Sequence, residues 1–214
     1  MLLVCDTEVD PDAYGYLPQG LRGLLPDHDH YHYPSGERPQ SLDGVDALVV
    51  TGSTAGVYEA DDRPWIHEAK ALVREAIDRE IPTLGVCFGH QLVNDALGGR
   101  VEHRGLRKGI ETVRFAEDPL FDSVGARVPM VHGDFVTELG DGMERIAAAD
   151  YYENLGSRHR DAPVWTVQYH PEFTAALLPQ IEADFGWPAN SSDRDFDGVS
   201  VERTLANFVG LSAE

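Results

Sequence analysis

At residues 82–91 an apolar strand pattern passes directly into a helical pattern, with a cysteine at the junction. The segment reads Pro-Thr-Leu-Gly-Val-Cys-Phe-Gly-His-Gln, so Cys87 stands between Gly85 and Gly89. A side chain at such a sharp strand-to-helix turn is forced outward, and the first helical N–H groups point at the group that it attacks. The flanking glycines let neighbouring backbone pass where a side chain would clash. The junction predicts a nucleophile elbow, and a buried structural cysteine before a helix is the alternative.

Strand and helix patterns alternate through the first half of the chain. Apolar runs predict strands at residues 2–5, 28–33, 47–51 and 83–86, and three- and four-residue apolar spacing predicts helices at 65–80 and 88–97. This alternation is typical of βαβ units around a mostly parallel sheet, which binds ligands at the carboxyl ends of its strands. Cys87 is therefore expected at the ligand-binding edge of an α/β fold.

Closely spaced strand patterns and turns fill the second half of the chain. They predict strands at residues 110–115, 128–132 and 164–170, which we expect to form an antiparallel extension of the same sheet. Residues 184–198 are predicted to be an exposed loop, and residues 201–211 an amphipathic helix that packs back onto the body. Because 214 residues suit one sizeable domain, we expect residues 1–214 to form a single domain.

Acidic residues dominate the charge of the chain, with 37 Asp and Glu against 17 Lys and Arg and a formal net charge of −20. Such a surface disfavours nucleic-acid binding, which needs basic patches. It keeps a protein soluble at the cost of self-repulsion, as in halophiles, so we predict a high-salt cytoplasm. Two distant cysteines, no apolar run of about 18 residues and no secretory leader pattern also predict a cytoplasmic protein without a membrane span.

The strand pattern at residues 164–170 ends in His-Pro-Glu. Pro171 is expected to keep this tripeptide extended, so the side chains of His170 and Glu172 would point the same way. A carboxylate bonded to one imidazole nitrogen fixes the tautomer and stabilises the imidazolium, as the orienting group of a catalytic triad does. A strand end at which proline blocks further pairing is the alternative. Together with Cys87, the tripeptide predicts a cysteine–histidine–glutamate triad.

A further strand pattern runs into the small-residue turn Thr-Gly-Ser at residues 51–53. Gly52 offers an unhindered backbone N–H at the same edge of the expected sheet as Cys87. With the N–H of Phe88 it would form a two-donor oxyanion hole for a tetrahedral intermediate. An ordinary strand-to-helix turn is the alternative for this glycine.

These motifs, in this order, resemble a known family. Thr-Gly-Ser at 51–53, Gly-Val-Cys-Phe-Gly-His-Gln at 85–91, His-Gly-Asp at 132–134 and Gln-Tyr-His-Pro-Glu-Phe at 168–173 are similar to class I glutamine amidotransferases. The similarity is to the free-standing kind, which resembles the amidotransferase portion of GMP synthase. It implies a flavodoxin-like open, mostly parallel sheet with helices on both faces. It also implies hydrolysis of glutamine to glutamate and ammonia through a cysteinyl γ-glutamyl thioester.

The resemblance implies a role for each residue of the predicted catalytic centre. Cys87 would be the nucleophile, His170 the general base and acid, and Glu172 its orienting carboxylate. The backbone N–H groups of Gly52 and Phe88 would be the oxyanion donors. The histidine after Phe88 is usually structural in this family, so it is not expected in the site.

The resemblance also implies substrate contacts. Gln91 would touch the bound glutamine, and the turn that contains His132 and Gly133 would hold its α-amino and carboxylate ends through the backbone. The sequence departs from the family at Val131, where relatives often have Ser or Asn, so a side-chain hydrogen bond is lost there. Arg-Lys-Gly at residues 107–109 replaces an acidic residue and glycine of many relatives, which leaves open whether this segment faces substrate or a partner.

No cofactor or metal is expected at this site. His28, His30 and His32 alternate along one predicted strand and would share a face able to bind zinc, but we favour a solvated polar face. The sequence has no G-x-x-x-x-G-K-[ST] loop, so this chain alone is not expected to activate an acceptor with ATP. An ATP-dependent synthetase subunit is a candidate partner for the ammonia, and the sequence leaves its existence open. The alternative functions are a stand-alone hydrolase of γ-glutamyl peptides or conjugates with the same triad, and a non-catalytic regulatory subunit.

Overall fold

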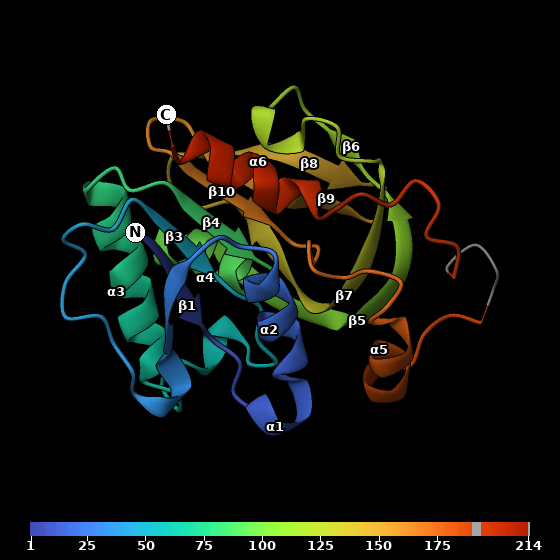
Figure 1. Cartoon of the computed structure of the whole chain (residues 1–214), viewed down its shortest axis with the longest axis horizontal. Coiled ribbons are helices and arrows are strands. Elements are labelled where there is room, and N and C mark those ends of the chain that lie inside the picture. Colours follow the sequence, from blue (N-terminus) through green and yellow to red (C-terminus); the bar gives the residue numbers. More distant parts are fainter. Residues whose placement is uncertain (190–193, 214) are drawn as a thin grey trace.

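The computed structural model describes residues 1–189 and 194–213, in which an eight-stranded sheet has the order β2-β1-β3-β4-β10-β9-β8-β6 (Figure 1). Five neighbouring strands run parallel, namely β2 (His28–His32), β1 (Leu2–Asp6), β3 (Ala47–Val50), β4 (Thr83–Val86) and β10 (Val164–Val167). Antiparallel strands extend the sheet, namely β9 (Tyr152–His159), β8 (Met143–Ala149) and β6 (Arg114–Phe115). The mostly parallel sheet with an antiparallel extension is confirmed.

Helices cover both faces of this sheet. Strands β1, β3, β4 and β10 are buried along their whole length, as expected for parallel strands that are packed on both sides. On one face, α3 (Trp65–Asp78) and α4 (Phe88–Ala96) pack against apolar side chains of β1 and β3. On the other face, α2 (Tyr16–Gly23) and α6 (Arg203–Leu211) pack against the opposite side chains. The flavodoxin-like arrangement is confirmed, and no described helix is long and apolar enough to cross a membrane.

A separate two-stranded antiparallel sheet consists of β5 (Arg100–Thr112) and β7 (Arg127–Glu138). The expectation that residues 110–115 and 128–132 extend the large sheet is wrong for most of these residues, because β5 and β7 pair with each other. The predicted strand at 164–170 is β10, which belongs to the parallel part of the sheet beside β4 and not to the antiparallel extension. The extension comes instead mainly from β8 and β9, which the sequence patterns do not predict. A strand pattern specifies which face is apolar, but it does not specify the partner strand.

Smaller elements complete the chain. The sequence patterns do not predict α1 (Pro11–Tyr14), α2 or α5 (Leu178–Phe185), nor the 3₁₀ turns at Tyr33–Ser35, Val57–Glu59 and Pro119–Phe121. The predicted loop at 184–198 begins inside α5, and residues 190–193 of it lie outside the described residues. The three predicted helices are confirmed with slightly shorter bounds, and Gly98, with φ of 83°, follows the end of α4.

Candidate active site

Cys87 lies at a strand-to-helix turn of the kind that the sequence predicts. It follows β4 and caps α4 with φ of 53° and ψ of −103°, a strained conformation for a residue with a side chain. A Cβ on Gly85 would lie 2.5 Å from the carbonyl oxygen of Gly89, and a Cβ on Gly89 would lie 2.4 Å from that of Val50. Gly85 is therefore needed for β4 to pack against the start of α4, and Gly89 for the start of α4 to pack against β3. The predicted elbow is present in the backbone.

His170 and Glu172 meet just beyond the carboxyl end of β10, which is the strand next to β4. Nδ1 of His170 lies 2.7 Å from Oε1 of Glu172, and both side chains are buried. The tripeptide is not extended as predicted, because the Phe173 N–H donates to the His170 carbonyl at 3.0 Å and closes a turn. Pro171 suits the second position of such a turn. The turn, instead of strand alternation, brings the carboxylate onto the imidazole.

Electrostatics at this pair favour the protonated imidazole. Burial alone lowers the pKa of His170, but Cys87 and the Glu172 carboxylate outweigh burial and raise this pKa well above its ordinary value. The second carboxylate oxygen of Glu172, Oε2, is buried and has no hydrogen-bond partner among the described residues. His170 is therefore the main group that stabilises the negative charge of Glu172.

Gly52 follows β3 and lies against both Cys87 and His170. A Cβ on Gly52 would be 2.9 Å from Cε1 of His170 and 3.5 Å from Cβ of Cys87. Within the described chain, the N–H groups of Gly52 and Phe88 donate to no protein acceptor, so both are available to a ligand. The Thr7 hydroxyl donates to the Gly52 carbonyl at 3.0 Å and holds the loop in place. The oxyanion hole stays a prediction that this geometry permits.

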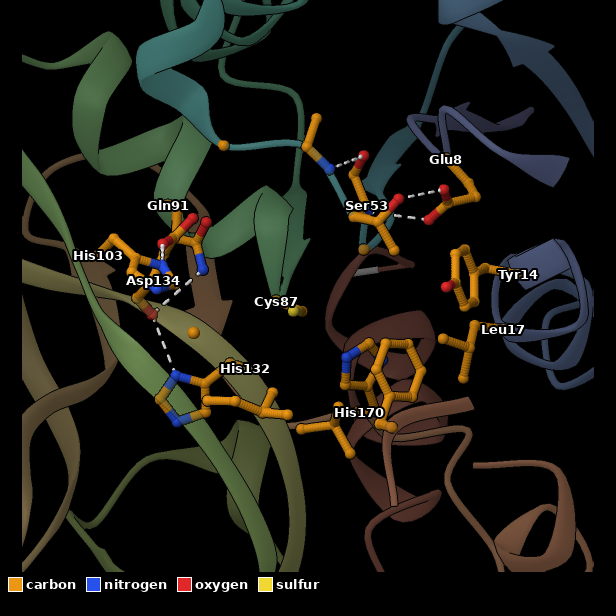
Figure 2. Close-up of a pocket in the computed structure, with 18 of the residues that line it drawn as sticks. Glu8, Tyr14, Leu17, Ser53, Cys87, Gln91, His103, His132, Asp134 and His170 are labelled. Carbon is orange, nitrogen blue, oxygen red and sulfur yellow. Dashed lines mark hydrogen bonds and ion pairs between the residues drawn. The ribbon is translucent and has the colours of Figure 1, made fainter. Parts of the chain in front are cut away.

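Cys87 adjoins a cavity of about 360 Å³ at the carboxyl edge of the parallel strands (Figure 2). Most of the predicted site residues line this cavity together, namely Gly52, Cys87, Gln91, Val131, His132, Gly133 and His170. Phe88 and Glu172 are not among the lining residues: Phe88 packs its ring against Trp65 in the core, and Glu172 is buried beside His170. Figure 2 shows Gln91, Asp134 and His132 on one side of Cys87, with Leu17 and Tyr14 on the other.

The wall that contains Gln91 is polar. Nε2 of Gln91 lies 3.4 Å from the carbonyl oxygen of Asp134. The Asp134 carboxylate accepts a hydrogen bond from the Tyr58 hydroxyl at 3.2 Å and lies 2.8 Å from Nδ1 of His103. The sequence does not predict Tyr58 or His103 in the site. Asp134 belongs to the His-Gly-Asp motif at 132–134, but the sequence predicts only backbone contacts there and not the contacts of its carboxylate.

Residues 131–133 lie within β7 and not in the turn that the resemblance implies. Both ring nitrogens of His132 are engaged, Nδ1 with the Asp134 carbonyl at 3.0 Å and Nε2 with the Tyr151 hydroxyl at 3.0 Å. Burial lowers the pKa of His132 to about 4, so its ring is neutral near pH 7. The backbone of this segment is thus the part left to hold a substrate, and its contact with the ends of glutamine stays a prediction.

The opposite wall combines one carboxylate with apolar side chains. Glu8 follows β1 and accepts hydrogen bonds from the backbone N–H and the hydroxyl of Thr54, at 3.0 and 2.7 Å. Burial raises the pKa of Glu8, and these hydrogen bonds partly offset the effect. Tyr14 and Phe185 stack with ring centroids 5.2 Å apart, and Leu17 lines the same cavity. The position of Glu8 after a parallel strand could have signalled it, whereas nothing in the sequence signals the apolar residues.

His90, in the motif after Cys87, is structural as the resemblance implies. Its ring is fully buried, with Nδ1 2.7 Å from the Thr166 hydroxyl and Nε2 3.1 Å from the Tyr152 hydroxyl. Burial lowers its pKa to about 3, which keeps the ring neutral. Cys5, the other cysteine, is a buried core residue of β1.

The three alternating histidines of β2 lie on an edge strand of the sheet. Nδ1 of His28 contacts the Pro26 carbonyl at 2.8 Å, and Nε2 of His32 contacts the Glu8 carbonyl at 2.7 Å. The described residues contain no group of three or more His, Cys, Asp or Glu side chains arranged to hold a metal ion. A shared zinc site on this strand therefore has no geometric support.

Comparisons with known proteins agree with the motifs. Residues 27–187, well over half of the chain, match the family model described as glutamine amidotransferase class-I. GMP synthase [glutamine-hydrolyzing] of Porphyromonas gingivalis is 33% identical over 187 residues, which cover 85% of this chain and 34% of that protein. The same enzyme of Clostridium novyi is 31% identical over 138 residues, which cover 63% and 26%. The chain thus spans about a third or less of the length of these curated relatives.

Solved structures share the fold. A glutamine amidotransferase from Thermotoga maritima superposes with a TM-score of 0.78 at 22% identity, covering 100% of this chain and 98% of that chain. A glutamine amidotransferase from Methylobacillus flagellatus has a TM-score of 0.68 at 16% identity, with 98% and 94% covered. These distant structures show the fold, and the family model and the sequence relatives show the family. The chain belongs to the class I glutamine amidotransferase family, whose members hydrolyse the side-chain amide of glutamine.

Proposed function

We propose that this chain hydrolyses glutamine through a γ-glutamyl thioester on Cys87 and releases ammonia for use by a partner. The observation that carries the proposal is the meeting of Cys87, His170 and Gly52 at one cavity, with Glu172 bonded to His170. A thiol, a base, an orienting carboxylate and free N–H donors are the parts that acyl transfer requires. The family supplies glutamine as the substrate.

In this mechanism His170 holds the proton that the thiol loses. Because Nδ1 of His170 faces Glu172, Nε2 is the nitrogen left for proton exchange with Cys87 and the substrate. The thiolate attacks the carboxamide carbon, and the carbonyl oxygen becomes an oxyanion. The N–H groups of Gly52 and Phe88 would stabilise this charge, each donor contributing about 10²–10³ in rate.

Collapse of the tetrahedral intermediate breaks the bond between carbon and nitrogen. His170 gives its proton to the leaving nitrogen, which departs as ammonia and leaves a thioester. Water then attacks the thioester carbon while His170 takes a proton from it. Glutamate is released, and the thiol of Cys87 is restored.

The test is ammonia release from glutamine by the purified chain. Cys87→Ala and Cys87→Ser are expected to abolish it, since neither retains a thiol. Cys5→Ala is the matched control, because that cysteine is buried in β1 away from the cavity. An electrophilic glutamine analogue should label Cys87 in wild-type protein and not in Cys87→Ala. Full ammonia release by Cys87→Ala would exclude the proposal.

The size of the cavity favours a second candidate, a hydrolase of larger γ-glutamyl amides. The volume of about 360 Å³ lies within the range of roughly 300–1,000 Å³ typical of sites for drug-sized ligands, which are larger than glutamine. The leaving amine must lie within reach of His170. On the wall across Cys87 from Gln91, Tyr14, Leu17 and Phe185 could then contact an apolar group on that amine.

The two candidates differ in their preferred leaving group. We would compare kcat/KM for glutamine with kcat/KM for γ-glutamyl butylamide and γ-glutamyl glycine. A preference for glutamine supports the amidotransferase, and a preference of tenfold or more for butylamide supports the second candidate. Leu17→Asp should lower kcat/KM for butylamide more than for glutamine if the apolar wall holds the leaving amine.

We propose that an ATP-dependent synthetase subunit is the partner that uses the released ammonia. The matched relatives are named GMP synthase, and about two thirds of each lies beyond the matched region. Residues 1–214 would act as one cytoplasmic domain that needs no cofactor. A pull-down from native extract at high salt should recover an ATP-using synthetase, and recovery of the chain alone would contradict this partnership.

A further inference from the structure

Gln168 lies beside the sulfur of Cys87, and the mechanism above gives it no role. We propose that Gln168 is a positioning residue that stabilises the thiolate of Cys87 and links it to the substrate wall of the cavity. The inference rests on the proposed role of Cys87 as nucleophile. It adds a second group, besides His170, that holds the sulfur charge.

Contacts at both ends of the Gln168 side chain carry the proposal. Nε2 lies 3.5 Å from Sγ of Cys87, within hydrogen-bond range for sulfur, and Oε1 lies 3.4 Å from Nε2 of Gln91. Gln168 is 0% exposed, so its amide is shielded from bulk water. One buried side chain therefore bridges the nucleophile and a residue expected to touch glutamine.

The Asp134 carbonyl, which accepts a hydrogen bond from Gln91, fixes which end of the Gln168 amide faces the sulfur of Cys87. Gln91 also approaches the backbone carbonyl of Asp134, which can only accept a hydrogen bond, so the end of Gln91 that faces it must be the NH₂ group. That same NH₂ group faces Gln168, which must therefore present its oxygen. The NH₂ group of Gln168 is left to point at Cys87.

The backbone around Gln168 holds this side chain on the cavity side of the chain. The Gln168 N–H donates to the Leu155 carbonyl at 2.8 Å and ties the residue to β9. The next residue, Tyr169, is buried and contacts the hydroxyl of Thr204 on α6 at 2.6 Å. Tyr169 is thereby anchored toward α6, while Gln168 and His170 both reach Cys87.

The amide of Gln168 and the imidazole of His170 have different roles at the sulfur of Cys87. A neutral N–H that donates to an anion makes a charge-assisted hydrogen bond, and it never takes the proton itself. Gln168 can therefore hold the thiolate both before attack and when the sulfur leaves during thioester hydrolysis. His170 changes its protonation state in those same steps.

The test measures how the rate of Cys87 alkylation by iodoacetamide depends on pH. Gln168→Met keeps the length of the side chain but has no N–H donor, and Gln168→Glu keeps the shape but places a carboxylate beside sulfur. We expect the midpoint of the rate profile to rise by about one pH unit in Gln168→Met, a tenfold slower reaction below the midpoint. The rise should be larger in Gln168→Glu. Rates at high pH should approach those of wild type.

Gln40→Met, on an exposed glutamine outside the cavity, is the matched control and should leave the profile unchanged. Glutamine turnover should show the same order of variants, with kcat falling at least tenfold and KM changing less. A purely structural role would instead slow alkylation equally at every pH and spare the isosteric Glu variant. Either result would overturn the proposal.

Failure of the proposed function gives a different outcome. If Cys87 is not the nucleophile, wild-type protein will release no ammonia and the electrophilic analogue will not label it. If wild type is active and labelled while Gln168→Met keeps the wild-type pH profile, the inference on Gln168 alone is wrong. Thermal unfolding of each variant separates both cases from misfolding.

Discussion

Gly52 lies where an added Cβ would meet both the nucleophile Cys87 and its base His170. A side chain at this position would fall against the ring of His170 before it reached any flexible neighbour. Glu172 holds the imidazole at Nδ1, the atom next to Cε1, so the ring has little room to yield. The spacing between Cys87 and His170 therefore depends on the absence of a side chain at Gly52.

We predict that Gly52→Ala lowers kcat for glutamine by about 10²-fold, because displacement of a catalytic group by about 1 Å has an effect of this size. Stability should change little, because Gly52 lies in a loop after β3. Steady-state kinetics and thermal unfolding measure the two effects. Gly23→Ala is the control, since a Cβ there meets nothing within 4 Å. Wild-type kcat in Gly52→Ala would show that the contact has no effect.

Glu172→Gln should lower kcat while KM changes less, because a neutral amide holds the imidazole but no longer stabilises its positive charge. A related change from carboxylate to amide in a triad costs up to about 10⁴ in kcat. The pH profile is the decisive measurement, since the pKa of His170 is raised in part by Glu172 and should fall in the variant. An unchanged profile would remove Glu172 from the orienting role.

Sequence reasoning was strongest for residues whose chemistry is local. The sequence predicts Cys87 because its glycines and strand-to-helix switch lie within a few residues, and it predicts His170 and Glu172 because only Pro171 stands between them. Their meeting with Cys87 follows from adjacent parallel strands. Gln168 stands in the same motif as His170, yet its contact with sulfur could not be predicted, because pairing of strands fixes the backbone but not a buried amide.

At the level of elements, α4 is held against the sheet by the absence of a side chain at Gly89. A Cβ there would come within 2.4 Å of the Val50 carbonyl oxygen, which is backbone and cannot swing away. The Gly89 N–H also donates to the Thr51 carbonyl at 3.1 Å. The start of α4 and the end of β3 are thus fixed to each other at the site where Cys87 and Gly52 face the cavity.

Gly89→Ala should therefore lower the free energy of unfolding by about 2 kcal/mol or more, the cost of overpacking where the backbone must move. Denaturant unfolding measures this loss. Gly210→Ala, in α6, is the contrasting variant, because its Cβ would meet nothing within 4 Å. Alanine there should raise stability by about 0.5–1 kcal/mol, as in helix interiors generally. Equal effects at the two positions would contradict the packing argument.

Elements with one clear period were predictable, and those defined by a partner were not. The apolar strands β1, β3 and β4 and helix α3 carry their pattern in the sequence. The pairing of β5 with β7 depends on which strand lies nearby in space. Helix α5 is stabilised by packing Leu178 and Ile181 into a buried cluster with Phe173 and Trp187. Neither the β5–β7 pairing nor the packing of α5 can be predicted from the pattern of a few consecutive residues.

For the whole molecule, the buried histidines set how stability depends on pH. The pKa values of His90 and His132 are lowered to about 3 and about 4, while an unfolded histidine titrates near 6.5. Between these values and about pH 6.5, the unfolded chain binds protons that the folded chain does not. Acidification over this range therefore favours unfolding. The raised pKa of His170 has the opposite sign and weakens stability only above about pH 6.5.

We predict that acidification below about pH 6.5 lowers the free energy of unfolding with a contribution of about 1.4 kcal/mol per pH unit from each of the two histidines. Denaturant unfolding at a series of pH values gives the slope. His90→Gln should remove one histidine's share of the slope, whatever its effect at pH 7. An identical slope in wild type and variant would refute the assignment.

The formal net charge of −20 leads to a prediction about salt. If self-repulsion among carboxylates limits stability, the protein should unfold at low ionic strength and refold when molar KCl is restored. Circular dichroism during dialysis follows both steps, with sucrose as a control for effects that do not depend on charge. Unfolding that is indifferent to KCl would contradict a high-salt habitat.

The acidic chain has few amino groups, and each of them has a hydrogen-bond or ion-pair partner. The chain has two lysines: Lys70 pairs with Asp95 at 2.6 Å, and Lys108 donates to the Phe185 carbonyl at 2.7 Å. The α-amino group of Met1 pairs with Asp46. Acylation of the lysines, for example by succinimidyl esters, would therefore break the contact between α3 and α4 or the contact between β5 and α5. Acylation of the α-amino group would break its pair with Asp46. Coupling of this protein to a support or a dye is better directed at its carboxylates.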